Sequence, residues 1–109
     1  VGCQVASLAA FLEHGTWHDP TLAVYDAMLR IDDRSFTHNE RRQYLRPVVQ
    51  DFWDLQMEVN PPVPPKTARQ GWLDGNLANV AALHRAGVPL LTGSDLGFLN
   101  TYPGFSLHD

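Results

Sequence analysis

Two kinds of hydrophobic pattern alternate along this chain of 109 residues. Apolar residues recur every three or four positions from Val5 to Leu12, which predicts a helix that ends before Gly15. A second long helix is predicted over residues 67–86, with Gly87 as its stop. Residues 88–91 are instead apolar at every position, which is typical of a parallel strand that is buried on both faces.

The segment between these helices is predicted to be a helical region followed by a stiff connector. Thr37 and Glu40 form a capping-box pattern, so we expect a helix to begin near residue 38, and an apolar stripe continues it as far as residue 55. Pro47 lies inside this helix and predicts a kink or a break. Residues 60–65 carry four prolines and end the helix as a polyproline-like connector.

The two glycines in the segment 67–86 weaken its first turns. Gly71 and Gly75 each cost about 1 kcal/mol relative to alanine in a helix, so a start only after Gly75 is an alternative. The stretches on either side of the connector are each too short for a stable core of their own. We therefore expect residues 1–109 to form one domain, with a helical insertion at about 37–59 and the proline-rich connector at 60–65.

Composition and charge exclude several classes of function. The net charge is −4 and the eight Lys and Arg residues are scattered, so no basic patch indicates nucleic-acid binding. The chain contains no run of 18 apolar residues, so no membrane span is predicted. Cys3 is the only cysteine and cannot form an internal disulfide, which fits a cytoplasmic protein. The chain begins at Val1 without methionine, and we expect both of its ends to be truncated.

A carboxylate follows the predicted strand at residues 88–91. The chain continues as Thr92, Gly93, Ser94 and Asp95, so a sharp turn with short hydroxyl side chains leads directly to the carboxylate. In parallel α/β folds the functional groups lie just beyond the carboxyl ends of the strands. Asp95 is therefore the first candidate for a functional residue.

The run GVPLLTGSDLG, followed by YPGFSLHD, resembles the last barrel strand and the following loop of the metal-dependent amidohydrolases. The similarity is to the branch that includes imidazolonepropionase and prolidase-like enzymes. Residues 16–24, which contain Pro-Thr-Leu, resemble the penultimate strand of the same family. The resemblance implies a helix-rich α/β fold that is a fragment of a (β/α)8 barrel, with its last two strands and the insertion between them. A complete barrel needs roughly 250 residues and is excluded by length.

The resemblance also implies a reaction, namely the hydrolysis of C–N bonds in amides or cyclic amides with a divalent metal such as zinc. Asp95 would be the catalytic residue and a metal ligand, while Thr21 and Ser94 would line the substrate pocket. The family's His-x-His pair and bridging lysine are absent, since the one lysine, Lys66, follows the proline run. Catalytic zinc usually has three protein ligands. We therefore expect this chain to bind no metal and to be inactive as an isolated chain.

Two other interpretations stay open. In the first, the chain is a non-catalytic interaction module derived from that fold, and this module covers its apolar surface with a second copy. Alternatively it would be a small complete enzyme that uses His18, Asp19, Asp95 and His108, although these residues have no ligand spacing. We interpret His14 as a residue at the end of a helix. The expected partners are a second copy or the remainder of a barrel, and a small-molecule substrate only when the barrel is complete.

Overall fold

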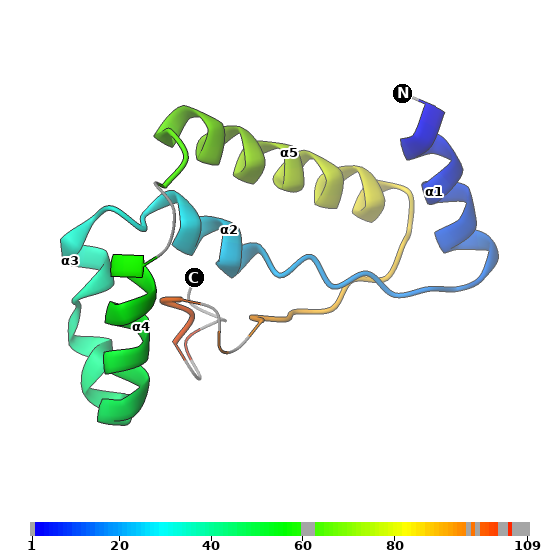
Figure 1. The fold of residues 1–109 in the computed structure, drawn as a ribbon. Helices are drawn as coiled ribbons and strands as arrows, with labels where there is room; N and C mark the ends of the chain where they lie inside the picture. The colour runs from blue at the N-terminus through cyan, green and yellow to red at the C-terminus, as the bar shows by residue number, and fades with distance from the viewer. Residues whose placement is uncertain (1, 60–62, 96, 98, 103–104, 106–109) are drawn as a thin grey trace.

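The described part of the chain is built from helices. The structure, a computed structural model, describes residues 2–59, 63–95, 97, 99–102 and 105, and the side chains from residue 8 onward (Figure 1). The elements are α1 (Gly2–Glu13), α2 (Leu22–Leu29), α3 (Arg34–Thr37), the 3-10 helix η1 (Glu40–Tyr44), α4 (Pro47–Val59) and α5 (Lys66–Arg85). No strand occurs among these residues. The expected α/β class, a barrel fragment with two strands, is therefore wrong.

The segment expected to be the penultimate strand is non-helical chain that ends in a helix. Helix α2 begins at Leu22, within the predicted strand at residues 16–24. Val24 and Ala27 lie three positions apart in this helix, and both are buried. This spacing gives α2 one buried face, and the helix packs on α5. Pro20 has no backbone N–H to donate to a strand partner, so it favours the change from extended chain to helix.

The segment expected to be the last strand makes a single parallel bridge, between His18 and Leu90. The His18 N–H donates to the Pro89 carbonyl over 2.9 Å, and the Leu91 N–H donates to the His18 carbonyl over 2.8 Å. Val88 is buried, but the side chain of Leu91 is 48% exposed, so burial on both faces does not occur. A pair of short extended segments without further neighbours is at best marginally stable, which explains why the bridge does not grow into a sheet.

The helical insertion predicted at 37–59 consists of two separate elements, η1 and α4, after the last residue of α3. Thr37 ends α3, and its hydroxyl contacts Nδ1 of His38 at 2.9 Å, so it is not the expected helix cap. Asn39 caps η1 instead, because its side-chain oxygen accepts from the Arg41 N–H at 2.8 Å. The break predicted at Pro47 is confirmed. Pro47 is the first residue of α4, where its missing N–H costs no helical hydrogen bond.

The two helix stops predicted at glycine are confirmed. Gly15 follows α1 with φ of 60°, and Gly87 follows α5 with φ of 86°. Glycine adopts this left-handed conformation without steric cost. The alternative start after Gly75 is wrong, because α5 begins at Lys66 and continues through both internal glycines.

Among the helices of the described ranges, none combines the length and the apolar character that a membrane span needs.

Arg69 joins α5 to the end of α2. Its side chain is almost completely buried, and its guanidinium donates to the carbonyls of Met28 and Leu29 at 2.9 and 2.7 Å. It also donates to the carbonyl of Pro64 at 2.9 Å and makes two hydrogen bonds to the Asp32 carboxylate, at 3.1 and 2.5 Å. The last carbonyls of a helix have no partner within the helix, so Arg69 supplies the missing donors.

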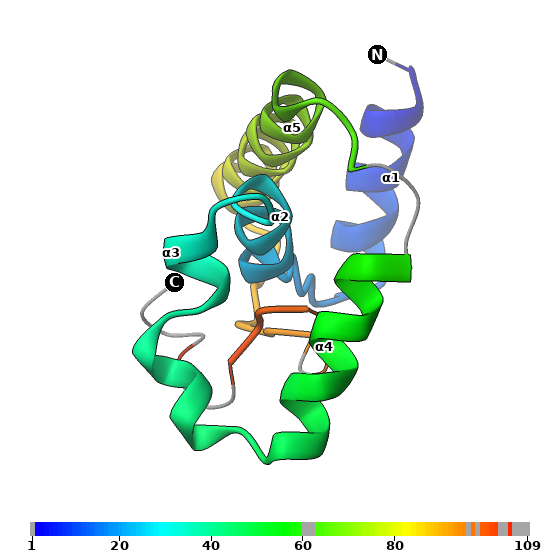
Figure 2. The same ribbon diagram turned by 60° about the vertical axis from the view of Figure 1, so that its left-hand side comes forward.

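A second cluster of buried residues lies between η1, α4 and the C-terminal segment. Leu45, Trp53 and Tyr102 form it, with the rings of Trp53 and Tyr102 in edge-to-face contact at 5.4 Å. The described C-terminal segment lies between η1 and α4 (Figure 2). The radius of gyration is 16.2 Å, against about 13 Å for a compact domain of this length. The two clusters therefore belong to an elongated molecule of 45 × 29 × 20 Å.

Candidate functional site

The segments that resemble the amidohydrolase motifs lie side by side. The bridge between His18 and Leu90 places the chain leading into α2 beside the chain that leaves α5 (Figure 1). The Asp19 carboxylate accepts a hydrogen bond from the Thr21 N–H at 3.3 Å. It also lies directly over Gly93, where a Cβ atom would overlap the carboxylate. Residues 18–21 and 90–95 therefore form one junction between two distant parts of the chain.

Two of the residues predicted for the site have unusual backbone conformations. Thr21 has φ of 42° and Asp95 has φ of 49°. Positive φ is uncommon outside glycine, and it is a clear outlier for a β-branched residue such as threonine. Such conformations cost of order 1–3 kcal/mol and cluster at functional sites. Both outliers lie in the junction, on the two segments that the bridge joins.

The predicted site residues differ in exposure. Thr21 and Ser94 are half-buried, and Asp95 is exposed. The Thr101 hydroxyl donates to the backbone carbonyl of Asp95 at 3.4 Å, which leaves the Asp95 carboxylate outside that interaction. The structure brings together the two segments that carry these residues, while their roles in substrate and metal binding stay predictions. Sequence reasoning missed the contact between Asp19 and Gly93, for which Gly93 itself is the only local signal.

The histidines considered for a site have separate surroundings. The His18 ring packs edge-on against Phe11 of α1, with ring centroids 5.7 Å apart, so it serves packing between α1 and the junction. His14 lies just after α1 and lines a shallow hollow of about 290 Å³ with Phe11 and Thr16. His108 lies outside the described residues.

The donor groups of the described residues do not assemble a metal site. Nowhere in the described ranges do three or more His, Cys, Asp or Glu side chains gather. Catalytic zinc is usually held by three protein ligands and keeps one position for water or substrate. The described side chains therefore do not form a site for a divalent metal, and no chemical step through a metal follows from them.

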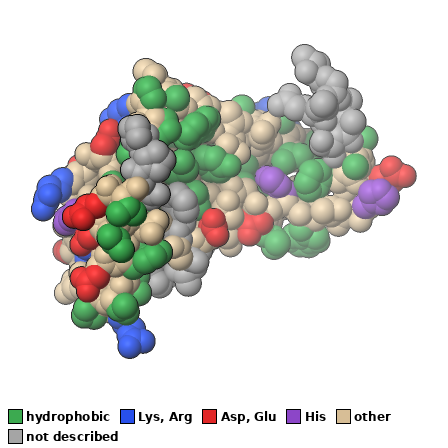
Figure 3. Space-filling view, viewed as in Figure 1, with side chains coloured by type: hydrophobic (Ala, Val, Ile, Leu, Met, Phe, Trp, Pro, Cys, Tyr) green, Lys and Arg blue, Asp and Glu red, His purple; other side chains and the backbone are tan. Residues whose placement is uncertain are grey.

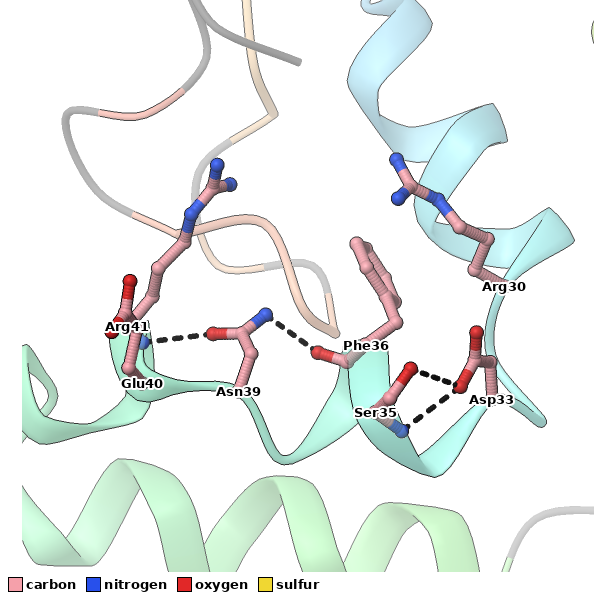
Figure 4. A pocket seen from close by; sticks show the side chains of 7 residues that line it. All are labelled: Arg30, Asp33, Ser35, Phe36, Asn39, Glu40 and Arg41. Atoms are coloured by element: carbon pink, nitrogen blue, oxygen red, sulfur yellow. Dashed lines mark hydrogen bonds between the residues drawn. The ribbon is translucent and has the colours of Figure 1, made fainter.

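A separate pocket of about 300 Å³ lies between the end of α2 and η1 (Figure 4). Its lining residues are Arg30, Asp33, Ser35, Phe36, Asn39, Glu40 and Arg41. The side chains of Arg30, Phe36 and Arg41 point to the same side of the chain in Figure 4. None of the site residues predicted from sequence lies in this pocket. It is near the lower limit of the volumes at which small molecules bind.

Three charged groups of this pocket, those of Arg30, Asp33 and Arg41, have partners within the protein. Arg30 forms an ion pair with Asp26, and its guanidinium lies 4.2 Å from the centre of the Phe36 ring. Arg41 lies 4.6 Å from the centre of the Phe105 ring. Hydrogen bonds from Ser35 hold the pKa of Asp33 below its usual value. The pocket contains two cations and two carboxylates, so its balance of charge favours no class of ligand, and we assign no reaction to it.

Comparison with known proteins adds no relative. No protein-family model matches the chain, and no curated protein or solved structure matches it significantly. The resemblance to the amidohydrolases thus depends on the motif residues alone. The two motif segments meet at the junction, but neither forms the strand expected of it.

Proposed function

We propose that this chain supplies the C-terminal, proton-handling part of an amidohydrolase-like hydrolase that acts on C–N bonds of amides or cyclic amides. One observation supports the proposal above all others. The parallel bridge between His18 and Leu90 brings the two motif segments together, although neither forms a strand. The proposal concerns the chemistry of these segments and does not depend on a barrel.

Asp95 has the chemistry that the reaction needs. Hydrolysis of an amide begins when water attacks the carbonyl carbon, and it ends when the leaving nitrogen accepts a proton. A carboxylate at the site takes the proton from the attacking water and then passes it to that nitrogen. Asp95 is exposed and follows the bridged segment directly, and the half-buried Thr21 and Ser94 present hydroxyl groups that would orient the substrate.

Other groups must complete the site. A lone carboxylate does not generate hydroxide near neutral pH, and in the family that this chain resembles a divalent metal does so. The described residues do not fit such a metal, so its ligands would come from polypeptide other than the residues described. We therefore expect the 109-residue chain to be inactive by itself. The proposed compartment is the cytoplasm, which is consistent with the single cysteine.

The test is to express the chain together with the coding sequence that flanks it in its gene and to measure hydrolysis of a cyclic amide. Asp95→Asn keeps the size of the side chain and removes the base, so turnover should fall by at least about a hundredfold. The matched control is Asp74→Asn, because Asp74 is an exposed carboxylate on α5 that bonds only locally, to Gln70.

Three results would overturn the proposal. Turnover that Asp95→Asn leaves unchanged would show that the motif has been placed on the wrong residue. An equal loss in Asp74→Asn would show a general effect on folding. Flanking coding sequence without a His-x-His pair and further histidines would remove the expected source of the missing ligands.

A further inference from the structure

Helix α4 has apolar residues on two opposite faces. Trp53 faces inward and is 3% exposed. Val48, Phe52, Leu55 and Val59 are instead 64%, 52%, 52% and 64% exposed. With 3.6 residues per turn, these four positions lie within about 60° of arc, on the side of the helix away from Trp53. We call these four residues the outer stripe of α4. Figure 3 shows hydrophobic side chains that reach the surface over this end of the molecule.

The outer stripe is large enough to form the centre of an interface. The exposed fractions correspond to roughly 400 Å² of apolar surface on each chain. Patches of that size on a monomer often mark an interaction site. Two copies would bury about 800 Å² of apolar surface, and at an apolar share of about 60% the whole interface would reach about 1,300 Å². That area exceeds the roughly 1,000 Å² expected of a specific contact.

The charges beside the stripe favour an antiparallel partner of the same kind. Arg46 lies just before the first turn of α4, and Glu58 lies in its last turn. Both side chains are exposed. Two copies of α4 in antiparallel orientation bring the basic end of each helix beside the acidic end of the other. Parallel copies would place like charges together, and like charges in register are unfavourable. The helix dipoles also oppose each other in the antiparallel pair.

We propose that the outer stripe of α4 is the interface of a homodimer, in which the two α4 helices pack antiparallel across a two-fold axis. The centre of the stripe lies between Phe52 and Leu55. A two-fold axis there places Phe52 of one chain against Leu55 of the second copy, and Val48 against Val59. The contact is isologous, so it closes at two chains and leaves no stripe free to recruit a third. This inference is independent of the proposed hydrolase activity.

Sedimentation of the full 109-residue chain at about 100 µM tests the dimer, because an interface of this size is at the weaker end of the range. We expect a mass twice the 12.2 kDa of one chain. Phe52→Glu places a charge in the stripe of both copies and should weaken dimerisation by about tenfold or more. The matched control is Leu77→Glu, because Leu77 is 46% exposed but lies on α5. Circular dichroism confirms that both variants keep their helices.

Three sedimentation results would overturn the proposal. They are a wild-type chain that stays at 12.2 kDa, a dimer that Phe52→Glu leaves intact, and a dimer that Leu77→Glu weakens equally.

Cysteine cross-linking tests the orientation in a Cys3→Ser background. In the antiparallel pair, Val48→Cys chains mixed with Val59→Cys chains should form a disulfide-linked heterodimer. Val48→Cys alone should not cross-link. The two copies of position 48 would be about 16 Å apart along the helix axis, beyond the reach of roughly 7 Å between bridged Cα atoms. Efficient cross-linking of Val48→Cys alone, without the mixed product, would show a parallel pair and would refute the proposed geometry.

Discussion

Replacing Arg69 by methionine should remove a large part of the stability of this protein. The arginine side chain is 2% exposed and donates to three backbone carbonyls, those of Met28, Leu29 and Pro64. Methionine keeps the length of the aliphatic stem but donates no hydrogen bond. The variant therefore tests the hydrogen bonds of Arg69 with little change in packing.

The expected loss follows from these three hydrogen bonds. Each bond contributes about 1 kcal/mol net, which gives about 3 kcal/mol for the set. The ion pair with Asp32 is left out of this sum, because the Asp32 side chain is 54% exposed and solvent screens the pair. With a urea dependence of about 1.5 kcal/mol per molar, the unfolding midpoint should fall by about 2 M.

Urea unfolding followed by circular dichroism, at one fixed protein concentration, provides the measurement. The matched control is Arg34→Met, because Arg34 is exposed on α3, where substitutions change stability by about 0.5 kcal/mol or less. A midpoint for Arg69→Met within the range of the control would refute the reasoning. Arg69 would then not be the group that joins α5 to α2.

Four further predictions concern pH, packing and metal content. Burial raises the pKa of Tyr102, so the stability it contributes is complete below about pH 10 and is lost as the pH rises further; Tyr102→Phe should flatten the alkaline limb of an unfolding curve. The hydrogen bond from Arg69 lowers the pKa of Asp32, so its contribution is present above about pH 4 and is lost as the pH falls; an acid limb unchanged by Asp32→Asn would contradict this. Gly93→Ala should displace the Asp19 carboxylate and shift the amide resonance of Thr21 in an NMR spectrum, whereas an unmoved resonance would argue against the contact. The purified chain should bind no stoichiometric metal and hydrolyse no cyclic amide, dipeptide or lactone, and elemental analysis that finds about one zinc per chain bound through histidine would refute this.

The helix ends that were predicted correctly depend on one or two neighbouring residues. Gly15 and Gly87 end helices because glycine alone adopts the required backbone angles freely. Pro47 divides the middle segment because it has no N–H to donate. Each of these effects operates at its own position, so the sequence is enough to place it.

The sequence could not show in the same way that the two expected strands do not form. An apolar run such as residues 88–91 becomes a strand only when other strands satisfy its backbone on both sides, and the described residues supply one bridge. Arg69 was missed for a related reason. Its partners in α2 are 40 and 41 residues away in sequence, so no local pattern indicates them. The sequence shows that Asp95 follows the apolar run, but it does not predict the left-handed backbone of Asp95.

The lengths of two helices explain why the junction forms without a sheet. Helices α2 and α5 run antiparallel (Figure 1), and Arg69 fixes the end of α2 beside the start of α5. From Arg69 to Arg85, α5 extends about 24 Å, whereas α2 extends about 10 Å back to Leu22. The non-helical residues that lead from Leu22 back to His18 cover this difference of about 14 Å.

His18 therefore lies level with the end of α5, where Gly87 turns the chain back alongside it. The two segments meet in parallel because both then run toward the start of α2. Helix packing rather than strand pairing sets this register, so the ends that carry Thr21 and Asp95 lie on one junction even with a single bridge.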